Sequence, residues 1–464
     1  MADEPTAALF ASISTTAELR AATSDEAWVA AVLDFESALA LAGADAGVVP
    51  AEHARAIADA CARAVLDPAE VARGARLAGT PVPPILRALG DAAGDAAARY
   101  VHLGATSQDA LDTAAMLVSR RALVLVLAHL DRACDACAAL VSAHGDTLMT
   151  ARTLLQPALP TTFALKAAGW LDALLDARGE LARVRDERLA VQLGGAAGTL
   201  ASLGPAGPEV TSHLARRLDL REPRLPWHTA RARVAGLAAA LAIASGVAAK
   251  IALDVTLLMQ AEVAEAFEPA LEGRGGSSTL PHKRNPVGGA AVAAANRRAG
   301  ALAGLLVGNL AHEHERSVGA WQAEWETLGE LLQCSGGALA RVAETLEGLE
   351  VDAARMRANL DAAGGLLLGE RVALQLAPSL GRIAAHELVE RASRGALATR
   401  TPLGDALRQE PAAVAGLGST TLDELLDPAS YLGSAGLFAE RALACYRETR
   451  AAREAPATTA EGGR

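Results

Sequence analysis

Aromatic residues and strand signals are scarce in this chain of 464 residues. Phe, Trp and Tyr together make up 3% of it, whereas hydrophobic residues in total make up 51%. The apolar residues are therefore mainly Ala, Leu and Val, and alternating β-branched runs between Asn-Gly or Asp-Gly turns are missing. This composition favours helices that pack closely through small side chains. It argues against a β-sandwich, a fibrous repeat and intrinsic disorder.

Positive charge is not in excess either. The chain has 43 Lys and Arg residues against 54 Asp and Glu residues, which gives a net charge of −11. We therefore expect no nucleic-acid or membrane partner, because nucleic acids and anionic membranes bind broad basic surfaces. A small anionic substrate is compatible with this balance, since a few local cations are enough to hold it.

Cysteine is also rare, and five cysteines in a long chain do not form a disulfide framework. Cys134 and Cys137 form a CxxC pair, but no second pair follows to complete a zinc site, so we interpret them as buried residues of one helix. The acidic N-terminus lacks a signal-peptide pattern. The most apolar run, residues 234–249, ends at Lys250 and is interpreted as a core helix rather than a membrane span. We expect a cytoplasmic protein.

Helical spacing of apolar residues dominates the chain. Residues 25–44 place Trp28, Val32, Phe35 and Leu39 on one stripe. Five more long helices are predicted, at residues 108–130, 160–191, 231–267, 286–310 and 321–349. Helices of this length are typical of a bundle whose members run side by side.

We predict an all-α fold of three helical domains. Prolines interrupt the helices of residues 1–95, long helices form a central bundle over residues 96–350, and shorter helices with a frayed tail make up residues 351–464. Within the bundle, residues 234–241 show no polar face, and a helix that is apolar all round must be buried on all sides. We therefore expect several chains to associate through the central helices.

Two polar segments precede predicted helices. Segment 102–109 contains Thr106 followed by Asp109, a pattern that resembles a capping box at a helix start. Free N–H groups at a helix N-terminus attract anions, so hydroxyls there can help hold a carboxylate, although an ordinary cap has the same pattern. Segment 152–157 is interpreted as a plain loop that leads into the next helix.

Segment 273–286 is the strongest candidate site. Glycines on one side and prolines on the other enclose two serines, a His, a Lys, an Arg and an Asn. Asn285 suits a helix N-cap and Pro286 suits the first helical position, while the glycines permit a flap that closes over a ligand. A linker is the alternative, but a linker rarely concentrates such residues between two apolar helices.

A fourth polar segment, residues 312–317, contains two histidines. His312 and His314 are two residues apart and so do not share a helix face. A polar loop between helices is therefore favoured over a metal site.

Segment 276–286 closely resembles the signature loop of the fumarase/aspartase superfamily, Gly-Ser-Ser-x-Met-Pro-x-Lys-x-Asn-Pro, with Leu280 in place of the methionine. Segments 102–109 and 152–157 fall, in the same order, where the superfamily has its other two motifs. Shorter stretches resemble its 3-carboxy-cis,cis-muconate cycloisomerase branch, and these are residues 33–40, 99–109, 313–317, 325–328 and 427–433. The similarity covers residues 9–447.

This resemblance implies an all-helical homotetramer whose central helices pool into one multi-helix core. Each active site would take motifs from three subunits, and neither a metal nor an organic cofactor would be needed. The implied reaction closes the tricarboxylate 3-carboxy-cis,cis-muconate to 4-carboxymuconolactone through an aci-carboxylate intermediate. The reaction belongs to protocatechuate (β-ketoadipate) catabolism.

The resemblance also implies roles for particular residues. Ser277 would carry the proton on the loop, and Lys283 would stabilise negative charge beside it and bind substrate. The other residues that would bind substrate carboxylates, the last two as weaker candidates, are Thr106, Ser107, Gln156, Asn285, His102 and Arg316.

Two departures separate the chain from adenylosuccinate lyase. Leu154 stands where that enzyme carries a histidine linked to acid catalysis, and residues 80–82 read Thr-Pro-Val in place of its His-Asp-Val. An amine leaving group needs an acid, whereas a carboxylate, with an ordinary pKa of about 4, can leave unprotonated. The cycloisomerase reaction is therefore favoured, with His314 as a possible substitute acid.

Three alternatives remain open. Two are enzymes on the same scaffold, namely adenylosuccinate lyase and a lyase of secondary metabolism that acts on a substituted succinate. The third is a non-catalytic helical scaffold, against which the retained Ser277, Lys283 and Asn285 argue.

Overall fold

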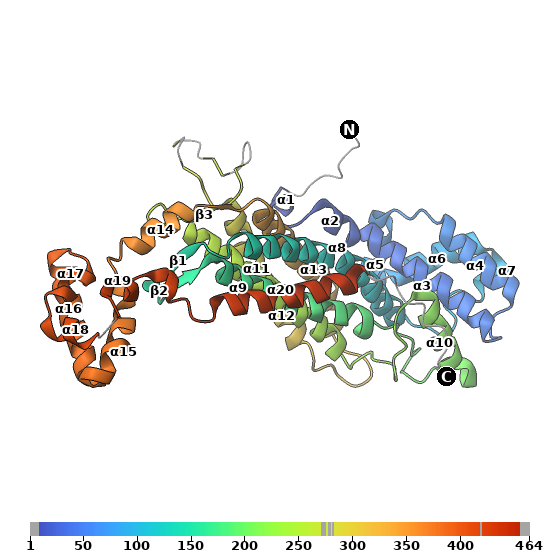
Figure 1. Cartoon of the computed structure of the whole chain (residues 1–464). Helices are drawn as coiled ribbons and strands as arrows, with labels where there is room; N and C mark the ends of the chain where they lie inside the picture. The colour runs from blue at the N-terminus through green and yellow to red at the C-terminus, as the bar shows by residue number, and fades with distance from the viewer. Residues whose placement is uncertain (1–8, 271–274, 277–279, 281–282, 418–419, 455–464) are drawn as a thin grey trace. The chain divides into compact units, whose positions relative to one another are not determined.

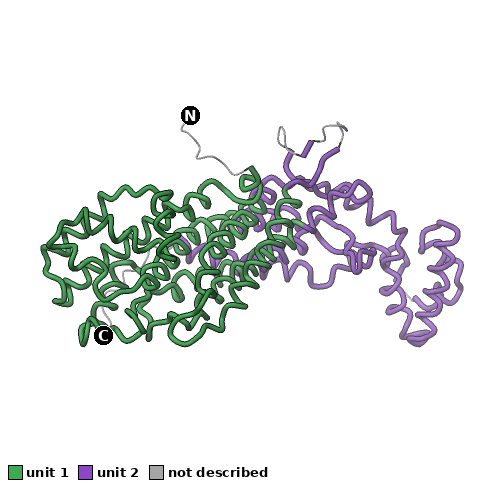
Figure 2. The backbone as a smooth tube through the Cα atoms, turned by 180° about the vertical axis from the view of Figure 1, so that it is seen from behind, with its two compact units in different colours: residues 1–132, 176–252, 288–343 green, residues 133–175, 253–287, 344–464 purple. Residues whose placement is uncertain are grey.

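The computed structural model describes residues 9–270, 275–276, 280, 283–417 and 420–454. The chain divides into two compact units, which Figure 2 shows in green and purple. Unit 1 holds residues 1–132, 176–252 and 288–343, and unit 2 holds residues 133–175, 253–287 and 344–464. Both units consist mainly of helices (Figure 1), so the all-α prediction is confirmed. The three-domain division of the sequence stays a prediction.

Capping residues mark the starts of two helices in the first part of unit 1. The side chain of Ser24 accepts a hydrogen bond from the N–H of Ala27 in the first turn of α3 (Asp25–Asp45). Pro68 occupies the first position of α5 (Pro68–Ala78), a place where its missing N–H costs nothing. The other short helices are α1 (Ala11–Ser14), α2 (Ala17–Ala22), α4 (Ala51–Arg63), α6 (Val82–Ala93), α7 (Asp95–Ala98) and α10 (Gly207–Leu218).

The predicted apolar stripe of α3 lies in the core of unit 1. Val32, Phe35 and Leu39 are at most 3% exposed, and Trp28 is half-buried. The helix packs against α4 and α10. Full burial of such side chains contributes about 1.5–3 kcal/mol each, so this stripe is what holds α3 in place.

Long helices follow, as predicted. Four of them contribute residues to both units, and these are α8 (Ser107–Ala143), α9 (Phe163–Arg183), α11 (Ala232–Leu258) and α13 (Ala320–Glu347). A fifth, α12 (Val287–Gly308), lies almost entirely in unit 1. Four ends differ from the prediction by three residues or more. Helix α8 continues to Ala143 rather than ending at residue 130, and α11 ends at Leu258 rather than at residue 267. Helix α9 begins at Phe163 rather than at residue 160 and ends at Arg183 rather than at residue 191. A π-helical turn, η1 (Val184–Arg188), terminates α9.

Two short strand pairs, which the sequence did not predict, accompany the helices. In unit 2, β1 (Leu148–Thr153) and β2 (Gln156–Thr162) form an antiparallel hairpin, and β3 (Ala266–Phe267) pairs with β4 (Glu350–Val351). Leu154 and Leu155 form the two-residue hairpin turn with φ angles of 50° and 65°. Turns of this kind normally use Asn-Gly, so two leucines carry no turn signal in the sequence.

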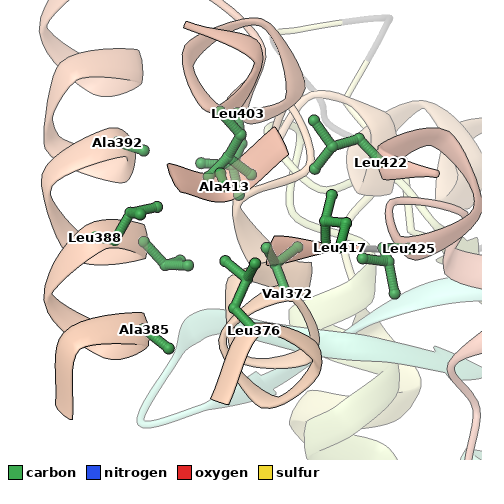
Figure 3. Packing of buried hydrophobic residues seen from close by; sticks show 12 residues of the cluster. Val372, Leu376, Ala385, Leu388, Ala392, Leu403, Ala413, Leu417, Leu422 and Leu425 are labelled. Carbon is green, nitrogen blue, oxygen red and sulfur yellow. The ribbon is translucent and has the colours of Figure 1, made fainter. Parts of the chain in front are cut away.

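The C-terminal part of unit 2 has a core of its own. Side chains of Val372, Leu376, Leu388 and Leu403 converge there and are at most 3% exposed (Figure 3). They come from short helices separated by Pro and Gly, as predicted. The helices of this part are α14 (Ala353–Asp361), α15 (Gly369–Leu380), α16 (Arg382–Thr399), α17 (Leu403–Arg408), α18 (Pro411–Gly416), α19 (Leu422–Leu425) and α20 (Ala435–Glu454).

The cysteines and the apolar helices also follow the predictions. Cys134 and Cys137 are 0% exposed on α8, whereas Cys445 on α20 is exposed. By length and composition, α3 and α11 could each cross a membrane, and 56% of the most apolar window of each is buried within the chain. Burial to this extent agrees with the interpretation of residues 234–249 as part of a core helix.

Candidate active site

The first turn of α8 carries two of the predicted site residues. Thr106 lies directly before the helix, and its N–H donates to Oδ2 of Asp109 at 3.0 Å, which forms one half of the predicted capping box. Thr106 and Ser107 are half-buried, and neither hydroxyl has a hydrogen-bond partner in the described part of the chain. The helix N-terminus and two hydroxyls can therefore hold a carboxylate.

Asp109 is the buried anchor of this turn. Its side chain is 0% exposed, and Oδ1 lies 2.6 Å from Nε2 of His228 and accepts the N–H of Gly194 at 3.0 Å. Oδ2 accepts the N–H of Gly195 at 2.9 Å as well as that of Thr106. Charge-assisted bonds of this kind fix the first turn of α8 against the glycine segment.

Arg316 reaches the same turn from the loop between α12 and α13. Its Nη1 donates to Oε1 of Gln108 at 3.0 Å, and its Nη2 donates to the carbonyl of Gly195 at 2.8 Å. The side-chain amide of Gln108 donates in turn to Oδ2 of Asp112 at 3.1 Å. The structure thus brings Arg316 to Gln108 in the first turn of α8, with its guanidinium already bonded to protein oxygens.

A buried ion network lies one turn further along α8. Arg231 is bonded to both oxygens of Asp112, at 2.8 and 3.0 Å, and to Glu324 on α13. The indole N–H of Trp321 donates to Oδ1 of Asp112 at 3.0 Å. Burial alone lowers the pKa of Arg231, but the two carboxylates raise it overall and keep the guanidinium charged. Sequence reasoning missed this network, because its members are far apart in the chain.

The two histidines of the polar loop are placed differently. The side chain of His312 is 0% exposed, with Nε2 at 3.6 Å from Oε1 of Glu324, and burial and the charge of Arg231 lower its pKa. His314 is exposed, with a φ angle of 45°. Its part as an acid stays a prediction. No group of three His, Cys, Asp or Glu among the described residues could hold a metal ion.

His102 lies four residues before Thr106, in the turn that leads into α8. Its Nδ1 is 2.6 Å from Oε1 of Glu36 on α3, and 15% of its side chain is exposed. Sequence reasoning missed Glu36. A signal for it exists in the sequence, because Glu36 directly follows Phe35 of the apolar stripe. A glutamate on a buried helix is almost always paired, so a partner for it could have been expected.

The segment of the second motif is a hairpin and not the plain loop that we expected. At its root, Arg152 donates two hydrogen bonds to the carboxylate of Glu265, at 2.9 and 2.7 Å. Glu265 is 0% exposed and also accepts from Asn359 on α14 at 2.8 Å. A bidentate pair of this kind fixes the hairpin within unit 2.

The tip of the hairpin presents apolar and polar groups together. Leu154 and Leu155 are 96% and 73% exposed. Gln156, the predicted substrate-binding residue, begins β2 and is also exposed.

The signature loop is only partly described, and Ser277 lies outside the described residues. The N–H of Asn285 donates to the carbonyl of Gly275 at 2.9 Å, which joins the two arms of the loop. Gly275 has a φ angle of 71°, and a Cβ there would lie 2.7 Å from the carbonyl oxygen of Asn285, so only glycine fits. Lys283 is exposed, and α12 begins at Val287, within one residue of the predicted start.

Arg284 attaches the loop to the small sheet of β3 and β4. Its guanidinium donates to both oxygens of Glu350 at 3.0 Å and lies over the ring of Phe267 at 5.0 Å. The hydrogen bond to Arg284 lowers the pKa of Glu350. Of the predicted site residues, His102, Thr106, Ser107 and Arg316 belong to unit 1, and Gln156, Lys283 and Asn285 belong to unit 2.

Comparisons with known proteins identify the family of the chain. Residues 5–299 match the family model described as lyase, and residues 365–442 match the adenylosuccinate lyase C-terminus. The chain is 48% identical to the 3-carboxy-cis,cis-muconate cycloisomerase of Pseudomonas aeruginosa, covering 96% of this chain and 97% of that protein. It is 45% identical to the nitrosuccinate lyase of Streptomyces davaonensis, covering 92% of each. The crystal structure of 3-carboxy-cis,cis-muconate lactonizing enzyme from Pseudomonas putida matches with a TM-score of 0.88 at 42% identity, covering 95% of this chain and 99% of that chain.

Proposed function

This chain belongs to the lyase family and, within it, to the 3-carboxy-cis,cis-muconate cycloisomerase branch, and we propose that it closes 3-carboxy-cis,cis-muconate to 4-carboxymuconolactone. The observation that carries the proposal is the similarity to cycloisomerases over nearly the whole chain. Two of them are 48% and 47% identical over 96% and 94% of this chain, and a solved structure matches at 42% identity over 95% of it. The departures from adenylosuccinate lyase support it, because lactone chemistry does not require a strong general acid.

The proposed chemistry is an intramolecular addition. A carboxylate oxygen of the substrate bonds to an alkene carbon, and the π electron pair moves onto the neighbouring carbon and its carboxyl group as an aci-carboxylate. A proton then adds to that neighbouring carbon, so no external oxidant or reductant takes part. The protein has to supply positive charge, hydrogen-bond donors and one proton.

Ser277 is the proposed proton carrier. Its hydroxyl gives the proton to carbon and recovers one from water, and Lys283 stabilises the negative charge that develops. This role rests on the resemblance of segment 276–286 to the superfamily loop. It also rests on the exposure of Lys283, which belongs to the same segment. The hydroxyls of Thr106 and Ser107 have no hydrogen-bond partner among the described residues, which supports their proposed role in binding a carboxylate.

Gln156 and Asn285 complete the proposed carboxylate-binding set, with His102 and Arg316 as weaker members. Gln156 is exposed at the start of β2, where its amide can reach a ligand. Arg316 is bonded to Gln108 and Gly195, so we propose that it acts mainly by bracing the first turn of α8.

We also propose a cytoplasmic homotetramer in which neighbouring subunits complete each active site. The central helices leave large apolar side chains uncovered in the single chain. The exposed ones on α8, α11 and α12 include Val124, Ile243, Leu253, Leu305 and Val307, at 41% to 59% exposure. Apolar surface of this amount on core helices supports burial against other copies.

A second candidate is a nitrosuccinate lyase, which is a substituted-succinate lyase of the kind left open by the sequence. The 45% identity to the Streptomyces davaonensis enzyme favours it. Nitrite, like a carboxylate, is a weakly basic leaving group and departs without a strong acid. The apolar residue at position 154 is therefore compatible with both reactions.

One assay separates the two candidates. The purified enzyme is mixed with 3-carboxy-cis,cis-muconate, and the loss of ultraviolet absorbance of the conjugated diene is followed. Parallel reactions with nitrosuccinate and adenylosuccinate are followed by nitrite release and by fumarate formation. We expect kcat/KM for the muconate to exceed the others by at least about a hundredfold, a difference of about 2.7 kcal/mol in transition-state binding. A higher kcat/KM for nitrosuccinate would replace the first proposal with the second.

A further inference from the structure

A buried carboxylate on α3 faces the imidazole of His102. Glu36 has a side chain that is 0% exposed, and its Oε1 lies 2.6 Å from Nδ1 of His102. The other oxygen, Oε2, is buried and has no hydrogen-bond partner among the described residues. His102 differs, because 15% of its side chain is exposed and its Nε2 bonds to no residue in the described part of the chain. Glu36 is therefore shielded from solvent, whereas the ring of His102 is accessible to a ligand.

The backbone holds His102 in an uncommon conformation. Its φ angle is 60°, a region that residues with a Cβ atom rarely adopt and that is often found at functional sites. The N–H of Ala105 donates to the carbonyl of His102 at 3.2 Å, which closes the turn. Gly104 has a φ angle of 84°, and a Cβ there would lie 2.4 Å from Leu203. The turn is thus fixed on both sides and orients the ring toward Glu36.

The charges around the ring favour the imidazolium. Burial lowers the pKa of His102, but the charge and hydrogen bond of Glu36, with the charge of Asp109 on α8, raise it overall. The charge of Glu36 also affects the pKa of the Cys61 thiol on α4. Burial, then the charges of Glu36 and Asp34, raise the pKa of this thiol to about 12. The charge of Glu36 therefore acts on groups of two neighbouring segments, the turn before α8 and helix α4.

We propose that Glu36 is a positioning residue for catalysis, which fixes His102 with Nδ1–H donated to Oε1 and Nε2–H available to a substrate carboxylate. This inference rests on the proposed function and deepens it. A carboxylate accepts hydrogen bonds and does not donate them, so Glu36 keeps a proton on Nδ1 and fixes the ring orientation. Its negative charge favours the imidazolium, the form that carries Nε2–H as well. The substrate has three carboxylates, and His102 supplies a cation four residues from the hydroxyl of Thr106.

The central experiment replaces Glu36 with glutamine, which keeps the shape and removes the charge. Without that charge the pKa of His102 falls, so the imidazolium is lost at a lower pH. In the pH profile of kcat/KM, the decrease on the alkaline side is expected to begin about one pH unit lower. At pH 8 we expect KM to rise about tenfold while kcat changes less than about threefold. The matched control is Asp34→Asn, which removes one charge from the same helix at a partner of Arg121 and leaves the pH profile unchanged.

A second variant keeps the inference testable if Glu36→Gln does not fold. His102→Gln removes the cation at a partly exposed position, and KM is expected to rise about as much as in Glu36→Gln. In the double variant the effects are not additive, because Glu36 acts through His102. Additive effects, or an unchanged pH profile in a folded Glu36→Gln, would overturn the inference. If Glu36→Gln does not fold, an unchanged KM in His102→Gln would overturn it.

Binding of propane-1,2,3-tricarboxylate, measured by calorimetry from pH 6.5 to pH 9, separates this inference from the proposed function. We expect the wild type to lose affinity for the tricarboxylate as the pH rises, and Glu36→Gln to lose it at a lower pH. This result would support the role of Glu36 and His102 even if the muconate is not turned over. Failure of wild-type turnover alone counts against the proposed function. A pH-independent affinity in the wild type counts against the role of His102.

Discussion

The two units hold their candidate site residues in different ways. In unit 1, Thr106 and Ser107 stand at the start of a long helix whose following carboxylates, Asp109 and Asp112, are buried and paired. In unit 2, Gln156 and the loop arm that carries Lys283 are exposed, and an ion pair fixes the base of each segment. From this difference we propose that unit 1 provides a preorganised carboxylate-binding surface, whereas unit 2 provides groups that adjust to a ligand.

The largest effect is expected on the loop in unit 2. Ser277→Ala removes the proposed proton carrier, and kcat should fall by about 10²–10⁴-fold, the usual contribution of a positioned proton donor. The diene assay gives kcat, and light scattering reports the oligomeric state, which should not change. Ser278→Ala is the matched control. Near-normal lactonisation by the Ser277 variant would show that another group carries the proton.

In unit 1 the expected effect is on stability. Arg231→Met leaves Asp112 and Glu324 buried without their cation, which should cost about 3–5 kcal/mol of unfolding free energy. Urea unfolding measures this loss. Arg298→Met is the control, because its pair with Glu330 is about half exposed on both sides and should contribute about 0–1 kcal/mol. Equal losses in the two variants would contradict a preorganised network.

A smaller effect is expected from Thr106→Ala. The N–H of Thr106, and not its hydroxyl, bonds to Asp109, so the fold should be unaffected. Loss of one hydrogen bond to a substrate carboxylate should raise KM about 5–10-fold. Steady-state kinetics against Ser142→Ala, at the other end of α8, tests this. An unchanged KM would remove Thr106 from the carboxylate-binding set.

The smallest effect is expected at the hairpin tip. Leu154→His restores the residue type of adenylosuccinate lyase at a side chain that is 96% exposed. We expect less than about a twofold change in kcat/KM, because a carboxylate can leave without being protonated. A large loss of rate with an unchanged circular dichroism spectrum would mean that the apolar tip itself takes part in the reaction.

Much of the fold could be predicted from the sequence, because long helices carry strong local signals. The stripe of Val32, Phe35 and Leu39, the start of α8 and the start of α12 were all readable from spacing and caps. The hairpin was not, since Leu154 and Leu155 adopt positive φ angles that leucine rarely takes. Its conformation is set by pairing of β1 with β2, which is not visible in local propensity.

The candidate site was predictable where it consists of contiguous motifs and not where it depends on distant partners. Thr106 and Asp109 are three residues apart, and their bond follows from helix geometry. The bond between His102 and Glu36 joins residues 66 positions apart, and that between Asp109 and His228 joins residues 119 positions apart. Such pairs arise from tertiary packing, so only a structure reveals them.

The burial of the cysteines has a practical consequence for experiments on this molecule. Cys61, Cys134, Cys137 and Cys334 are buried, and burial raises the pKa of the Cys61, Cys137 and Cys334 thiols, which keeps them in the unreactive form. Cys445 on α20 is exposed. A maleimide dye at neutral pH should therefore label one position per chain, so subunit exchange can be followed by fluorescence with the native sequence intact.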